Sequence, residues 1–288
     1  MLALLHRPQW LRALALTAAV SAACVLLGLW QWDRREERLA RIARVQANYA
    51  GDPVALRQVL AGPDDRLAAD EEWTPVLVRG QYQPEATVLV RNRPLPGAER
   101  YGYLVLVPLR LDDGTALLVD RGWIPAGPTG EAPSQVPAPP SGQVSVLARL
   151  RPPEPADDRS APAGQVQRID LAGSVRTELE AAAAAGPAAA AEGLVTGAYG
   201  VLVREDPPPA QAPAPAAAPS RDSGPHLAYT VQWFVFAAGA WVFFGVQLRR
   251  SAADPQEPRP SPRPARARRP SDEEHEDALL DAAASRRE

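Results

Sequence analysis

The sequence is poor in the residues that carry most redox and metal chemistry. Its 288 residues include one cysteine, one methionine, three histidines and no lysine. The single cysteine, Cys24, excludes an intramolecular disulfide bond, and a copper carrier would need a cluster of soft ligands that this chain does not supply. The formal net charge of −3 gives no electrostatic argument for nucleic-acid binding, which requires a clustered basic face.

The sequence also lacks the common catalytic motifs. It contains no G-x-S-x-G, P-loop, H-E-x-x-H or G-x-G-x-x-G pattern. The topology inferred below places His6 and His275 in the cytoplasm and leaves His226 as the only histidine outside it. A Ser-His-Asp site would have to use that one imidazole at a membrane surface, so we expect neither an enzyme nor a metal site built from protein ligands.

The first long apolar run is uncharged from Ala13 to Trp30 and extends to Trp32. A helix of roughly 20 such residues crosses the hydrocarbon core of a bilayer. A cleaved signal peptide, or a lipoprotein signal ending at Cys24, is the alternative, but such signals normally stop where this run continues for six more residues. We expect residues 13–32 to be a transmembrane helix that follows a short cytoplasmic N-terminus, residues 1–12.

A second uncharged run covers residues 227–248 and contains all four phenylalanines of the chain. Arg249 and Arg250 follow it directly, which predicts a transmembrane helix with a cytoplasmic C-terminal side. The arginine-rich segment after the first span argues for the opposite orientation, and we side with the C-terminal arginines, so both termini are expected in the cytoplasm. Small residues would allow the two spans to pack closely, namely Ala18, Ala22, Gly28, Ala237, Gly239 and Ala240.

The region between the spans predicts a helix over residues 33–49 and a β-rich extracytoplasmic domain over residues 53–206. Strand patterns occur at residues 75–82, 87–93, 101–111, 115–124, 143–150 and 197–205. Short turns between them favour an antiparallel sheet or a partial barrel, and one helix is expected over residues 170–185. A Pro/Ala linker, residues 207–225, and a disordered cytoplasmic tail, residues 251–288, complete a membrane protein of the α+β class.

The start of the second span carries a candidate binding face. His226 precedes the span, and Tyr229, Thr230 and Trp233 follow at helical spacing. A single histidine above an aromatic wall could hold a haem edge-on at the membrane surface. The alternative, which the spacing alone favours, is an interfacial histidine above aromatic side chains that face lipid.

A second candidate cluster lies on the predicted strands. Arginine forks bind carboxylates at two points, so the cluster could receive haem propionates. The alternative, which we favour, is a structural network in which Arg93 pairs with Asp120. We expect Gly102 and Gly122 to permit close packing of the backbone. The cluster consists of Arg91, Asn92, Arg93, Asp120 and Arg121.

Six motifs in this order resemble the Surfeit locus protein one family. They are Leu-Gly-x-Trp-Gln-x-x-Arg at residues 27–34, Val-Arg-Asn-Arg-Pro at 90–94, Gly-Tyr at 102–103 with Pro-Leu at 108–109, Asp-Gly at 113–114, Leu-Val-Asp-Arg-Gly-Trp-Ile-Pro at 118–125, and His-Leu-x-Tyr-x-x-x-Trp at 226–233. The resemblance is weak over residues 126–225, where the family's Trp-x-x-Arg-Asp element survives only as Arg-Ile-Asp at 168–170.

The resemblance implies an assembly factor for haem-copper cytochrome c oxidase in a bacterial inner membrane. It implies that the protein assists delivery of haem a, bound transiently, to the catalytic subunit, with that subunit and the enzymes of haem a synthesis as partners. His226 and Tyr229 match characteristic family positions, so a haem-ligand role for His226 gains support. A purely structural scaffold without haem contact, or an unrelated envelope-anchored binding domain, are the competing hypotheses.

Overall fold

The computed structural model describes residues 6–95, 101–127, 132–133, 135–185 and 191–253. The chain divides into two compact units. Residues 1–31 and 228–288 form the first, called the helical unit here, and residues 32–227 form the second, called the β unit. The tail expected over residues 251–288 lies outside the described residues beyond Ala253, and residues 251–253 continue the last helix.

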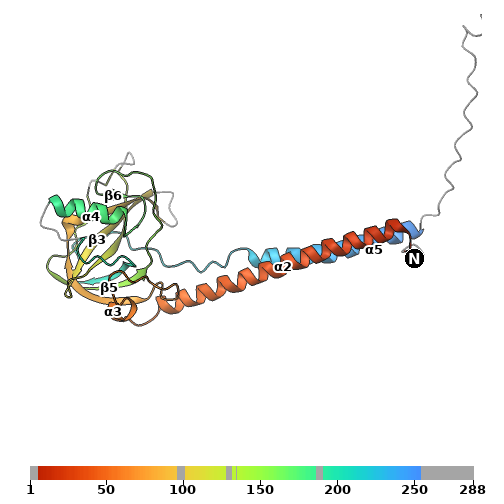
Figure 1. Cartoon of the computed structure of the whole chain (residues 1–288), viewed down its shortest axis with the longest axis horizontal. Helices are drawn as coiled ribbons and strands as arrows, with labels where there is room; N and C mark the ends of the chain where they lie inside the picture. Colours follow the sequence, from red (N-terminus) through yellow and green to blue (C-terminus); the bar gives the residue numbers. More distant parts are fainter. Residues whose placement is uncertain (1–5, 96–100, 128–131, 134, 186–190, 254–288) are drawn as a thin grey trace, which may run out of the picture. The chain divides into compact units, whose positions relative to one another are not determined.

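Two long helices, α2 (Pro8–Tyr49) and α5 (His226–Ala253), dominate the helical unit (Figure 1). Both are long and apolar enough to cross a membrane, with mean hydropathies of 2.1 and 1.5 in their most apolar stretches. The helix expected over residues 33–49 is the end of α2, which continues without a break from the apolar run because no proline or glycine interrupts it there.

The two helices contact each other within the helical unit through a polar side chain in an otherwise apolar interface. The Ser21 hydroxyl donates a hydrogen bond to the Ala237 carbonyl oxygen at 3.4 Å and accepts one from the Trp241 indole Nε1–H at 3.0 Å. Cys24 is buried on the same side of α2, three residues further along. The polar groups of Ser21 and Trp241 therefore satisfy each other within the interface.

Only some of the small residues expected at this interface lie in it. Gly28 and Ala237 are buried, and the ring of Phe234 lies so close to Gly28 that an added Cβ would be 3.1 Å from it. The prediction is wrong for Ala18, Ala22 and Gly239, which are exposed. The helices cross with the Ser21 side facing inward, so the other small residues point away from the partner helix.

The described residues of the β unit form seven strands, and five of these strands close into a ring. The strand order is β1-β5-β7-β4-β3-β2-β6, and β1 also pairs with β3, so β1, β5, β7, β4 and β3 form the β ring. The sequence predicted an antiparallel sheet or a partial barrel, and the pairing of β1 with β3 closes the observed barrel. The strands are β1 (Pro75–Tyr82), β2 (Val88–Pro94), β3 (Tyr101–Leu111), β4 (Ala116–Pro125), β5 (Gln143–Arg151), β6 (Gln165–Val166) and β7 (Tyr199–Asp206).

The short turns between the strands favoured an antiparallel sheet, but the observed sheet also contains parallel pairs. β4 pairs with β7 in parallel, and β2 pairs with β6 in parallel. Both parallel partners lie far along the chain, so no short turn marks them in the sequence. β6 is only two residues long and escaped prediction for that reason, as did the short helices α3 (Leu56–Val59) and η1 (Pro84–Ala86).

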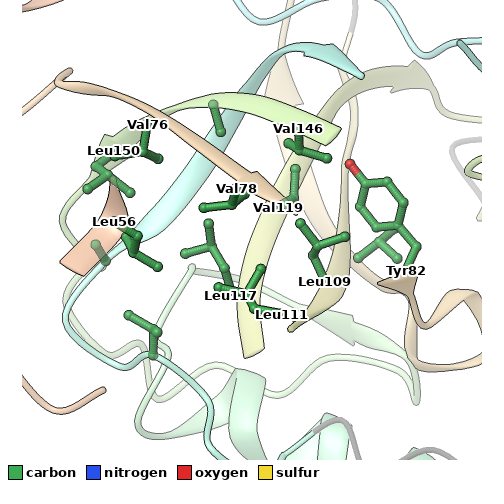
Figure 2. Packing of buried hydrophobic residues seen from close by; sticks show 14 of the residues in the cluster. Leu56, Val76, Val78, Tyr82, Leu109, Leu111, Leu117, Val119, Val146 and Leu150 are labelled. Atoms are coloured by element: carbon green, nitrogen blue, oxygen red, sulfur yellow. The ribbon is translucent and has the colours of Figure 1, made fainter. Parts of the chain in front are cut away.

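Burial along the strands follows their sequence patterns. β1 alternates between buried and exposed residues and β5 between buried and partly exposed ones, because one face lines the ring and the other faces outward. β3 and β4 are buried on both faces and read as nearly continuous apolar runs. Figure 2 shows the inner core, where side chains from α3 and the ring strands converge, including Leu56, Val76, Val119 and Leu150.

A second core lies on the other side of β3 and β4, beneath the helix α4 (Ser174–Ala185) (Figure 1). Val175 and Leu179 of α4, spaced one turn apart, are fully buried. The helix begins four residues later than expected, because the Asp170 carboxylate accepts hydrogen bonds from the backbone N–H groups of Gly173 and Ser174 and so caps it from outside. This second core explains why β3 and β4 have no polar face.

The last turn of α2 is attached to β5 within the β unit. The Arg149 guanidinium lies 3.6 Å from the centroid of the Tyr49 ring, and its Nε–H donates to the Tyr49 carbonyl oxygen at 3.1 Å. The Asn48 amide donates to the carbonyl oxygen of Glu72 at 2.9 Å, and the Trp73 ring meets Tyr49 edge-on at 5.8 Å. The β unit therefore includes residues 32–49, and it is wider than the domain expected over residues 53–206.

Candidate functional site

The motif Asp120-Arg121-Gly122-Trp123 forms a bulge on β4. Leu104 of β3 pairs with Trp123, whereas Leu106 pairs with Asp120, so β4 carries one extra residue between the two pairings. Gly122 adopts φ +126°, which is strained for any residue with a side chain. A β-bulge re-aims side chains locally, and here four consecutive residues make four different sets of contacts.

Asp120 is a buried carboxylate, with 3 % of its surface exposed. Its Oδ1 accepts a hydrogen bond from the backbone N–H of Gly122 at 3.0 Å. Burial raises the pKa of Asp120 to about 6, although that hydrogen bond and the charges of Arg93 and Arg151 act in the opposite direction. The hydrogen bond from Gly122 therefore stabilises the bulge, whereas burial of the ionised carboxylate of Asp120 away from water destabilises the folded protein.

Arg121 is also buried, and both terminal nitrogens of its guanidinium group contact the surrounding β unit. The group donates to the Glu205 carboxylate at 2.8 Å and to the Pro137 carbonyl oxygen at 2.8 Å. Its Cζ lies 5.6 Å from the centroid of the Tyr82 ring. Burial, followed by the nearby charge of Glu205, raises the pKa of Tyr82 well above its usual range.

Trp123 connects β4 to β2 across β3. Its indole Nε1–H donates to the Arg93 carbonyl oxygen at 2.9 Å. The ring lies over Gly102, where an added Cβ would overlap the Ile124 carbonyl oxygen and the indole itself. At Gly122 an added Cβ would overlap the carbonyl oxygen of Ala214. Both glycines thus lie where neighbouring groups leave no room for a side chain.

The second arginine motif, Arg91-Asn92-Arg93, lies at an irregularity of β2. Asn92 adopts φ +58°, and the register with β3 shifts between Val90 and Arg93. Arg93 forms a two-point ion pair with Glu154, with one nitrogen–oxygen distance of 2.8 Å. Burial would raise the pKa of Glu154, but hydrogen bonds from Arg93 and from the backbone of Ile169 hold it below its usual range.

Arg93, Asp120 and Arg121 of this cluster thus make structural contacts, but their pairing differs from the expected one. Arg93 pairs with Glu154 and not with Asp120, whose carboxylate turns back to its own backbone. The forks of Arg93 and Arg121 are both engaged by protein carboxylates, so they do not fit haem propionates in this fold. Sequence patterns missed Glu154 and Glu205 because each lies far along the chain from its arginine. A buried acid within a predicted strand was the one available signal for Glu205.

The candidate face at the start of α5 divides into accessible and buried residues. His226 is the first residue of α5 and is partly exposed. Tyr229 is 46 % exposed, and Trp233 is partly buried, with its ring edge-on to Phe236 at 5.9 Å. Thr230 is 3 % exposed.

The burial of Thr230 follows from its place on α5. Ala237, seven residues further along and on the same side, contacts Ser21 of α2. Thr230 therefore faces the helix interface and not an open face. Tyr229, Thr230 and Trp233 belong to the helical unit, whereas His226 and the arginine cluster fall within the bounds of the β unit.

Among the described residues no three His, Cys, Asp or Glu side chains gather in a group that could hold a metal ion. The described part of the chain defines a protein of two long apolar helices, one before and one after a ring-shaped β domain in the sequence, and that domain contains a buried ion pair.

The sequence model of the SURF1 family matches residues 18–238, from within α2 to within α5. The chain belongs to the SURF1 family, which confirms the resemblance found in the motifs.

An uncharacterized SURF1-like protein of Mycobacterium tuberculosis is 29% identical over 246 residues, covering 85% of each chain. Surfeit locus protein 1 of Xenopus tropicalis is 28% identical over 160 residues, covering 50% of this chain and 48% of its own. A SURF1-like protein of Rickettsia bellii is 28% identical over 99 residues, covering 34% of this chain and 38% of its own.

Proposed function

We propose that this chain is a non-catalytic assembly factor for haem-copper cytochrome c oxidase. Membership of the SURF1 family over residues 18–238 is the observation that supports the proposal. Its partners are then the catalytic subunit of the oxidase and the enzymes that make haem a. Deleting the gene should lower oxidase activity and the haem a content of the membrane, and a plasmid copy should restore both. Normal values in the deletion strain would favour an envelope-anchored binding domain unrelated to the oxidase.

The proposal places α2 and α5 across a bacterial inner membrane, with the β unit outside and both termini in the cytoplasm. The length and composition of the helices support the spans, and Arg249 and Arg250 at the end of α5 support the orientation. A phosphatase fused after Gly127 should be active, and one fused after Ser251 should be inactive. The reverse pattern would place the β unit in the cytoplasm.

The cargo in this proposal is haem a, held transiently by His226 as an axial ligand. The imidazole is partly exposed at the first residue of α5, and the exposed ring of Tyr229 lies three residues further along. An imidazole binds haem iron, and a single axial bond suits a protein that must release its cargo. Thr230, buried on the side of α2, has no part in this contact.

A visible spectrum tests the haem role directly. The full chain is purified in detergent from cells that make haem a, and the Soret band is recorded for the wild type, His226→Ala and His6→Ala. We expect a Soret band in the wild type, its loss in His226→Ala and its retention in His6→Ala, which removes an exposed histidine at the other end of the chain. An unchanged band in His226→Ala would exclude His226 as the ligand.

A scaffold that never contacts haem is the second candidate. The observation that favours it is the engagement of Arg93 by Glu154 and of Arg121 by Glu205, which leaves neither fork open to a propionate. This candidate predicts that deletion of the gene lowers oxidase activity while the purified wild-type chain carries no Soret band. The gene deletion and the visible spectrum together therefore distinguish a haem carrier from a scaffold that does not contact haem.

A further inference from the structure

The segment between β7 and α5, residues 207–225, is attached to the β unit and is called the strap here. Ala214 and Trp123 exchange both backbone hydrogen bonds, at 2.7 Å and 2.8 Å, as an antiparallel pair. Pro213 is buried, whereas Gln211, Ala212 and Ala214 beside it are exposed. The Pro/Ala linker expected from the sequence is therefore not a free tether along its whole length.

The attachment point is the bulge made by Asp120-Arg121-Gly122-Trp123. The bulge turns the backbone N–H and C=O of Trp123 toward the strap. Gly122 lies directly beneath the Ala214 carbonyl oxygen, in the space that a side chain would fill. The Asp120 carboxylate holds the Gly122 N–H and with it the conformation at φ +126°. The motif thus has a use that neither the ion pairs nor haem binding explains.

The rest of the strap is held loosely. The Arg221 Nε–H donates to the Gln46 side chain at 3.0 Å, and the Arg38 Nε–H donates to the Asp222 carbonyl oxygen at 3.4 Å, both in exposed positions. Exposed polar contacts of this kind contribute little to stability. The pair formed by Ala214 and Trp123, together with buried Pro213 and with Ala216 packed against the second core, is therefore the firm attachment among the described strap contacts.

We propose that the strap is a releasable latch, docked on Gly122 and Trp123, which sets the length of free chain between the β unit and α5. With the strap docked through Ala216, 9 residues (217–225) remain before His226, and with the strap released, 19 residues (207–225) separate β7 from α5. Proline-rich chain extends by about 3.1 Å per residue, so the maximum span of free chain grows from roughly 28 Å to roughly 59 Å. Release lengthens the free chain of this connection without unfolding the β unit.

Amide hydrogen exchange tests the latch in the full-length protein in detergent. Ala214→Pro removes the N–H that donates to Trp123 and lies outside both hydrophobic cores. We expect exchange at the Trp123 amide to accelerate at least about tenfold, with the melting temperature of the β unit unchanged. Ala217→Pro, at an exposed strap position, is the matched control and should leave the exchange unchanged. Unchanged exchange in Ala214→Pro, or equal acceleration in both variants, overturns the proposal.

Distance measurement tests the change in free length. Spin labels are placed at Leu77→Cys and Ala218→Cys, two exposed positions, in a Cys24→Ser background. The docked strap should give a narrow distribution of distances, and adding Ala214→Pro should broaden it, as should Gly122→Ala if that variant folds. A distribution that stays narrow with Ala214→Pro shows that the strap is fixed by other contacts and overturns the proposal.

Discussion

Arg121 and Glu205 form a buried ion pair at 2.8 Å, although they lie 84 positions apart in the chain. Their side chains are 0 % and 3 % exposed. Removing one partner of such a pair leaves a charge without a counter-charge in the interior, which costs more than removal of the whole pair. The pair therefore links β4 to its parallel neighbour β7 in the β ring.

Glu205→Gln should lower the free energy of unfolding by about 3–5 kcal/mol, because Arg121 would keep its charge without a carboxylate. Replacing both residues with Met should cost less than this single change. The measurement is urea denaturation of the full chain in detergent, followed by near-UV circular dichroism. Arg57→Met is the exposed control, since its pair with Asp113 is 48 % and 42 % exposed, and it should cost less than about 1 kcal/mol. A cost below that level for Glu205→Gln would contradict a charged buried pair.

Asp120→Asn should flatten the dependence of stability on pH. The pKa of Asp120 is about 6 in the folded protein and 3.8 when unperturbed, so the folded state binds the proton more tightly. Stability due to this group is therefore greatest below about pH 4 and falls as the pH rises through about 6, by up to about 3 kcal/mol. The asparagine side chain does not titrate, yet its oxygen can still accept the Gly122 N–H.

The charged and titratable groups that face Asp120 are the same in the wild type and in Asp120→Asn. They are Arg93, Arg151, Glu154 and Tyr199. Melting temperatures of the full chain at pH 4.5, 5.5, 6.5 and 7.5 measure the difference. We expect the melting temperature of Asp120→Asn to rise relative to that of the wild type as the pH rises. At pH 7.5 the variant should be the more stable protein. Parallel curves would mean that Asp120 does not titrate in this range.

Gly102→Ala should destabilise the protein, because the new methyl group would overlap the Ile124 carbonyl oxygen and the Trp123 ring. Overpacking of this kind costs about 1–3 kcal/mol, and displacement of the ring would also break its hydrogen bond to Arg93. Gly62→Ala is the matched control, because its methyl group would make only ordinary contacts, at 3.8 Å from Asp65. Equal costs for the two variants, measured by urea denaturation, would show that Gly102 is not in a crowded position.

Tyr49 and Arg149 should be energetically coupled. Arg149→Lys keeps the charge but loses the planar stacking on Tyr49 and the Nε–H bond to its carbonyl oxygen. A double-mutant cycle with Tyr49→Leu should give a coupling of about 0.5–2 kcal/mol. Amide exchange in the last turn of α2 should accelerate in each single variant. A coupling near zero would mean that the stacking does not hold α2 to β5.

Much of the fold follows from patterns that a single strand or helix carries by itself. The bounds of β1 and β3 are those expected, because alternation in Pro75–Tyr82 and continuous apolarity in Tyr101–Leu111 are strong local signals. What failed depends on residues far apart. The parallel partner of β4, the pairing of Arg93 and Arg121 with their acids, and the attachment of Ala214 cannot be read from the neighbouring sequence.

The candidate site shows the same division. His226, Asp120 and the two glycines were singled out from their types and positions, and the crowding at Gly102 and Gly122 is visible in the structure. The expected pairing of Arg93 with Asp120 was wrong because burial and a bulge turn that carboxylate toward its own backbone. Thr230 shared a helical face with His226 in the sequence pattern, but the packing of α5 on α2 decides which part of that face is open.

The place of β7 in the ring has a consequence for synthesis of the protein. β7 comes last of the strands in the chain, yet it lies between β5 and β4. Until Asp206 has left the ribosome, β4 and β5 each keep one unpaired edge, and such edges promote aggregation of incomplete chains. A nascent chain halted before β7 is therefore a target for chaperones and proteases, whereas one halted within the strap already contains every strand of the ring.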